Sequence, residues 1–89
     1  MKTLILYRPV SEKASAVERY AHDYERQTGQ ALTMLDIDSH EGIELARVHD
    51  IVDHPVILAL RDDNSLVQSW LKFDKWPTIS ELSYYDQQQ

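Results

Sequence analysis

Two short runs of apolar residues constrain the fold of this chain more than any other feature. Thr3 to Tyr7 reads Thr-Leu-Ile-Leu-Tyr, and Val56 to Leu60 reads Val-Ile-Leu-Ala-Leu. A strand with one face in water alternates polar and apolar residues, whereas a strand that is buried on both faces does not. We therefore expect two buried strands with helices on both faces of their sheet, which is an α/β fold.

The segment between these runs begins with a pattern typical of a helix, and we expect that helix to span Ser11 to Thr28. Ser11 offers an N-cap, and Gly29 stands where a helix C-terminus favours glycine. The apolar positions are spaced three and four residues apart, which places them on one helical face. They are Ala14, Val17, Ala21 and Tyr24.

A second strand and a second helix are expected at Ala31 to Ile37 and at Glu41 to Val48. Asp36, Asp38 and Ser39 separate the two and can cap the helix. Gly42 weakens the start of this helix because glycine is a poor helix former. The residues expected to face the core wholly or partly are Ile43, Leu45, Ala46 and Val48.

The last third of the chain predicts a hairpin and a helix. A polar turn at 61–65 joins Val56 to Leu60 with a strand at Leu66 to Trp70, and the two should pair antiparallel. Pro77 suits the first turn of a final helix that carries Ile79, Leu82 and Tyr85. The element order is therefore strand, helix, strand, helix, strand, strand, helix, in one domain over 1–86 with a polar tail at 87–89.

Composition excludes several functions. The chain has no cysteine, which rules out thiol chemistry, disulfides and cysteine-ligated metals. Its two glycines cannot build a glycine-rich phosphate loop. Its formal net charge of -6 argues against binding nucleic acid or an anionic membrane. No signal or membrane-spanning segment is apparent, so we expect a cytoplasmic protein, with no cofactor and no metal.

The chain resembles the thioredoxin-like superfamily over nearly its whole length. Ile5-Leu6-Tyr7-Arg8-Pro9 is similar to the first strand and active-site loop of glutaredoxin-type proteins, and His54-Pro55 with the following strand is similar to the cis-proline segment. Leu35-Asp36-Ile37-Asp38 and the helix at 45–51 also match, more generically. The resemblance implies a mixed four-stranded sheet in the order second, first, third, fourth strand, and a cis peptide between His54 and Pro55.

The departure from this family lies in its redox motif. Where the family has Cys-x-x-Cys, this chain reads Ser11-Glu12-Lys13-Ala14, so Ser11 and Ala14 replace the two cysteines. A serine hydroxyl has no accessible disulfide state, so thiol-disulfide exchange is excluded. The resemblance implies a ligand or peptide groove at this place, formed by Pro9, Val10, Ser11, Ala14, Asp53, His54 and Pro55.

Each candidate residue also has a plainer interpretation. Ser11 can be a simple N-cap, and His54 can be a half-exposed histidine without a role. The pairs His49-Asp50 and Asp53-His54 have ligand types that suit zinc, but Pro55 prevents a regular helix there, and no Ser-His-Asp spacing indicates a hydrolase.

An aromatic run leads from the fourth strand into the last helix. It comprises Trp70, Phe73, Trp76, Tyr84 and Tyr85. Tryptophan and tyrosine are enriched in binding hot spots, so this run can be a surface for a partner or for self-association. Alternatively, the aromatic rings fold back and cover the edge of the sheet.

Three functions remain open from the sequence. The first is a redox-inactive binding module that takes a protein or peptide partner, or a second copy of itself. The second is a minimal glutathione-binding or transferase-like enzyme that uses the Ser11 hydroxyl, as the resemblance implies for some glutathione transferases. The third is a structural subunit of an assembly. The sequence excludes a thiol-disulfide oxidoreductase and assigns no catalytic residue.

Overall fold

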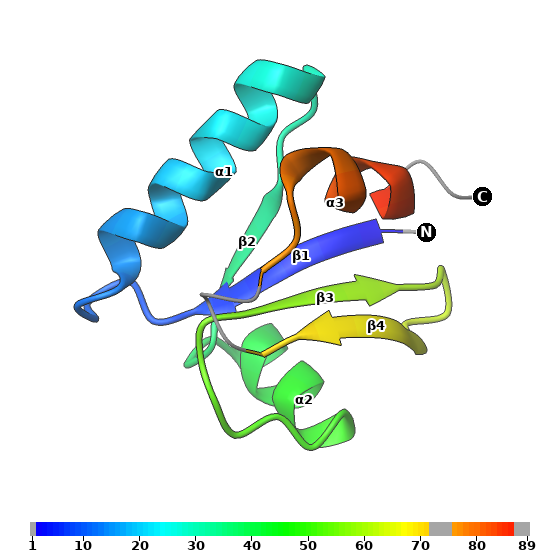
Figure 1. Cartoon of the computed structure of the whole chain (residues 1–89). Coiled ribbons are helices and arrows are strands. Elements are labelled where there is room, and N and C mark those ends of the chain that lie inside the picture. The colour runs from blue at the N-terminus through cyan, green and yellow to red at the C-terminus, as the bar shows by residue number, and fades with distance from the viewer. Residues whose placement is uncertain (1, 72–75, 87–89) are drawn as a thin grey trace.

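The computed structural model describes residues 2–71 and 76–86 of the chain (Figure 1). Seven elements follow one another in the predicted order. They are β1 (Lys2–Tyr7), α1 (Ala14–Thr28), β2 (Thr33–Asp36), α2 (His40–Val48), β3 (Val56–Leu60), β4 (Leu66–Trp70) and α3 (Ile79–Asp86). The tail at 87–89 lies outside the described residues.

The four strands form one mixed sheet in the order β2-β1-β3-β4, which confirms the predicted order. β1 and β2 run parallel, with Leu4 opposite Thr33. β1 and β3 run antiparallel, with Leu6 opposite Val56. β3 and β4 form the predicted antiparallel hairpin, with a register irregularity between Ala59 and Leu60. Both central strands are thus flanked by hydrogen-bonded neighbours.

Successive side chains of β1 and β3 point to opposite faces of the sheet, so the two strands contribute to two apolar clusters. Ile5 and Ile57 belong to one cluster with residues of α1 and α3, such as Tyr24 and Leu82. Leu6 and Leu58 belong to the other, against which Leu45 of α2 packs. In Figure 1, α1 and α3 lie above the sheet and α2 lies below it. The five residues of β3 are all buried, as their sequence indicates.

Helix α1 begins three residues later than predicted. Its N-cap is Lys13, which makes no side-chain capping bond, so the assignment of Ser11 as the N-cap is wrong. The Ser11 carbonyl instead accepts a hydrogen bond from the Ala14 amide at 3.2 Å, which closes a separate turn before the helix. The predicted buried face is confirmed, since Ala14, Val17, Ala21 and Tyr24 are all buried. Gly29 ends the helix in the left-handed conformation, with φ of 77°.

The last helix also begins later than predicted. Pro77 lies before α3, whose first turn is capped by Thr78: the Glu81 amide donates to Thr78 Oγ1 at 3.2 Å. Pro77 is buried, and its carbonyl accepts a hydrogen bond from the Tyr20 hydroxyl at 2.9 Å. This bond ties the segment before α3 to α1.

Helix α2 is held at its start by two contacts. Ser39 is the N-cap, and its Oγ accepts a hydrogen bond from the Gly42 amide at 3.0 Å. A Cβ atom at Gly42 would collide with the carbonyl oxygen of Asp36, so a glycine is required for this close approach. The prediction that Ile43 and Val48 face the core is wrong, since they are 52% and 64% exposed. α2 therefore rests on the sheet mainly through Leu45.

Candidate functional site

The loop after β1 and the segment before β3 meet at one end of the sheet. Leu6 pairs with Val56 in adjacent antiparallel strands, so the chain leaves β1 next to the place where it enters β3. The loop at 8–13 therefore begins beside Pro55. This register brings the two halves of the predicted groove to the same edge of the sheet.

The loop at 8–13 consists of successive turns. The Ser11 amide donates to the Arg8 carbonyl at 3.0 Å, and the Ala14 amide donates in turn to the Ser11 carbonyl. Pro9 is exposed, and the Val10 side chain is 91% exposed at the tip of the loop. Ser11 is half-buried, and its hydroxyl has no hydrogen-bond partner within 2–71 and 76–86. Because Ser11 does not cap α1, its hydroxyl is available to a ligand.

The segment before β3 supplies the other half of the predicted groove. The peptide bond between His54 and Pro55 is cis, as predicted. Asp53 is exposed, His54 is half-buried and Pro55 is buried. Ala14, by contrast, is 7% exposed and belongs to the core, so its side chain is not available to a ligand.

An ion pair that the sequence analysis missed joins the loop that follows β1 to the loop that follows β2. The Arg8 guanidinium donates from Nε to Asp38 Oδ2 at 3.1 Å and from Nη2 to Asp38 Oδ1 at 3.4 Å. The two side chains are 44% and 61% exposed, so the pair adds at most about 1 kcal/mol to stability. Its signal was available, because Arg8 and Asp38 follow closely after the ends of neighbouring parallel strands.

The neighbouring Tyr7 is the last residue of β1. Burial raises the pKa of its phenol, and the carboxylates of Glu18 and Asp36 raise it further. The phenol is therefore neutral near pH 7. Its side chain packs against the apolar cluster that β1 and β3 form with α1 and α3.

Most of the described residues of the aromatic run pack against other side chains of the protein. The rings of Trp70 and Tyr85 meet edge to face, with centroids 5.3 Å apart. Trp76 packs against Tyr20 in the same geometry, and its indole nitrogen donates to the Trp70 carbonyl at 3.1 Å. Among the residues of this run that the structure describes, only Tyr84 projects outward, with 65% of its surface exposed. Phe73 lies outside the described residues. These contacts favour the interpretation that the rings cover the sheet.

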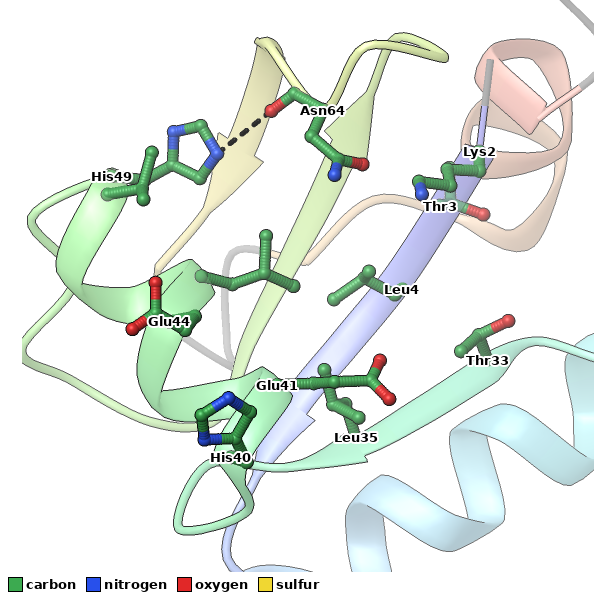
Figure 2. Close-up of a pocket in the computed structure, with 12 residues that line it drawn as sticks. Lys2, Thr3, Leu4, Thr33, Leu35, His40, Glu41, Glu44, His49 and Asn64 are labelled. Atoms are coloured by element: carbon green, nitrogen blue, oxygen red, sulfur yellow. Dashed lines mark hydrogen bonds between the residues drawn. The ribbon is translucent and has the colours of Figure 1, made fainter.

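The sequence analysis also missed a cavity between α2 and the β1–β2 part of the sheet, which we call the α2 trough (Figure 2). Its volume is about 540 Å³, and it lies on the α2 face of the sheet. Several of its lining residues lie just outside the predicted elements, among them Lys2, His40 and His49. The trough itself depends on how far α2 extends across β1 and β2, and no local pattern specifies that placement.

A scan of the chain against protein-family models finds no matching family, and a search of curated protein sequences finds no similar one. Within the described ranges, no helix has the length and apolar character needed to span a membrane. No three His, Asp or Glu side chains among these residues gather in a metal-binding arrangement. The function must therefore be inferred from the geometry.

Proposed function

We propose that this chain is a redox-inactive, thioredoxin-like binding module whose helices cover both faces of the sheet. The proposed site is the groove between the loop at 8–13 and residues 53–55, and its ligand is a peptide segment in extended form. The observation that carries the proposal is the register of β1 and β3, which brings an exposed loop beside the entry to β3.

Two further features support a binding role at this edge. Ligands of open α/β sheets bind outside the carboxyl ends of parallel strands, and the loop at 8–13 follows the carboxyl end of β1, beside that of β2. In addition, Val10 exposes almost its whole side chain next to the half-buried Ser11. An apolar side chain beside a free hydroxyl suits a ligand that combines an apolar residue with a polar backbone.

The test is a selection of binders from a display library of random 12-residue peptides, followed by titration of a selected synthetic peptide into the ¹⁵N-labelled chain. Saturable shifts of the amides at 8–14 and 53–56 are expected. Val10→Ser should weaken binding by at least fivefold, because it removes most of an apolar contact. The control is Ile43→Ser, which changes an exposed isoleucine on α2 and should leave binding unchanged.

The proposal fails if the library yields no saturable ligand. It also fails if the shifts lie outside these two segments, or if Ile43→Ser weakens binding as much as Val10→Ser does.

A second candidate is a glutathione site that uses Ser11, and the unpartnered hydroxyl of that residue favours it. Here the Ser11 hydroxyl would donate a hydrogen bond to the thiolate of glutathione. A thermal-shift experiment with millimolar glutathione should raise the melting temperature of the wild type, and Ser11→Ala should abolish that rise. An unchanged wild-type melting temperature refutes this candidate and leaves the peptide groove untouched.

A further inference from the structure

The α2 trough has an apolar floor formed by the outer surface of the second core cluster. Leu4 of β1 is 5% exposed, and Leu35 of β2 and Leu45 of α2 are half-buried beside it. All three line the cavity (Figure 2). Its volume of about 540 Å³ lies within the range of small-molecule pockets, about 300–1,000 Å³. The trough can therefore hold a small ligand with an apolar body.

Opposite charges stand at the two ends of this floor. Helix α2 begins after the carboxyl end of β2. At the C-terminal end of α2, His49 Nε2 donates a hydrogen bond to the Asn64 carbonyl in the β3–β4 turn, at 3.1 Å. Lys2 lies at the end of the floor that is near the β3–β4 turn, opposite Leu60 in β3. Glu41 lies in the first turn of α2. In Figure 2, Leu4 lies between the Lys2 side chain and the Glu41 carboxylate.

The charged groups at the two ends are available to a ligand. Glu44, which also lines the trough, accepts a hydrogen bond from Arg47 Nη2 at 2.8 Å, and this bond lowers the pKa of its carboxyl. Lys2 and Glu41 form no ion pair with any residue that the structure describes. A ligand can pair with an ammonium at one end and a carboxylate at the other without displacing an existing partner.

We propose that the α2 trough binds a short apolar peptide with free termini. Its N-terminal ammonium lies beside Glu41, its C-terminal carboxylate lies beside Lys2, and its side chains rest on Leu4, Leu35 and Leu45. The seven steps between Glu41 and Val48 rise about 10 Å along α2, which is the length of about three extended residues. A single amino acid does not fit, because its two charged groups are carried by one carbon atom.

The peptide Leu-Ala-Leu is the probe, in three forms: with free termini, with an acetylated N-terminus and with an amidated C-terminus. Titration into the ¹⁵N-labelled chain should give saturable shifts of the amides at 2–4 and 40–49. Because ion pairs at exposed ends are weak, each cap should raise the Kd by about two- to fivefold. The apolar floor supplies the remaining affinity.

Two variants assign each end. Glu41→Gln should abolish the effect of acetylation and preserve the effect of amidation, and Lys2→Met should do the reverse. Glu25→Gln, an exposed carboxylate on α1, is the matched control and should preserve both effects. Binding of the three forms with equal Kd, shifts confined to 8–14 and 53–56, or an absence of saturable shifts would each overturn the proposal. The second of these results would place the peptide in the groove of the proposed function, so the two sites are tested separately.

Discussion

Substituting Gly42 by alanine tests the packing that places α2 against the sheet. In a helix interior, alanine is favoured over glycine by about 1 kcal/mol, so helix propensity alone predicts a more stable protein. The structure predicts the opposite, because the new Cβ would collide with the carbonyl oxygen of Asp36. That atom belongs to the backbone where β2 ends, and it cannot rotate away as a flexible side chain can.

The expected magnitude follows from the two opposing effects. Overpacking costs about 1–3 kcal/mol, and contact with the backbone places this site at the upper end of that range. After subtraction of the gain in propensity, Gly42→Ala should lower the free energy of unfolding by about 2 kcal/mol. A chain of this size has a urea m-value of about 1 kcal/mol/M, so the unfolding midpoint should fall by about 2 M.

Urea unfolding followed by tryptophan fluorescence measures this shift, because Trp70 and Trp76 are half-buried in the fold. Gly29→Ala is the control: φ at Gly29 is 77°, yet nothing lies within 4 Å of an added Cβ. Its cost should be about 1 kcal/mol, from backbone conformation alone. A midpoint that rises in Gly42→Ala would refute the steric argument and the placement of α2 that follows from it.

Three further variants probe other contacts. Ser39→Ala removes the N-cap of α2 and should cost about 1 kcal/mol in urea unfolding; an unchanged midpoint would show that the cap is dispensable. Tyr20→Phe removes the hydrogen bond to the Pro77 carbonyl and should cost about 1 kcal/mol at pH 7. Burial raises the pKa of Tyr20 to about 12, so its phenol ionises in the unfolded state at lower pH than in the folded state. The free energy of unfolding should therefore fall between about pH 10 and 12, and this fall should be smaller in Tyr20→Phe than in the wild type. Ser11→Cys combined with Ala14→Cys places two thiols across the turn closed by the hydrogen bond between these residues, so oxidation should remove both free thiols in an Ellman assay; thiols that persist would contradict the turn geometry.

Much of the fold could be predicted because its signals are local. The uniform burial of β3 follows from five consecutive apolar residues, and the buried face of α1 follows from the spacing of Val17, Ala21 and Tyr24. The start of α1 could not be predicted in this way. Serine is a good N-cap in general, but here the loop at 8–13 makes its own turns first, and the helix begins only at Ala14.

The candidate site was predicted in part. The resemblance pointed to the loop after β1 and to the cis bond at Pro55, and the register of β1 and β3 brings those segments to one edge. The groove that the resemblance implied also included Ala14, which the structure places in the core. The pair between Arg8 and Asp38 joins residues 30 positions apart, and the sequence analysis missed it although the two strands that precede these residues were expected to be neighbours.

The sequence by itself determined the elements, their order and the absence of thiol chemistry. Periodicity and turn residues are properties of neighbouring positions, and the absence of cysteine is a property of the composition. Only the tertiary structure decided which polar groups lack a partner and where the surface is concave. Ile43 and Val48 are apolar residues, yet they are exposed because the nine residues of α2 rest on the sheet mainly through Leu45. The α2 trough results from that placement, which depends on contacts between residues far apart in the chain.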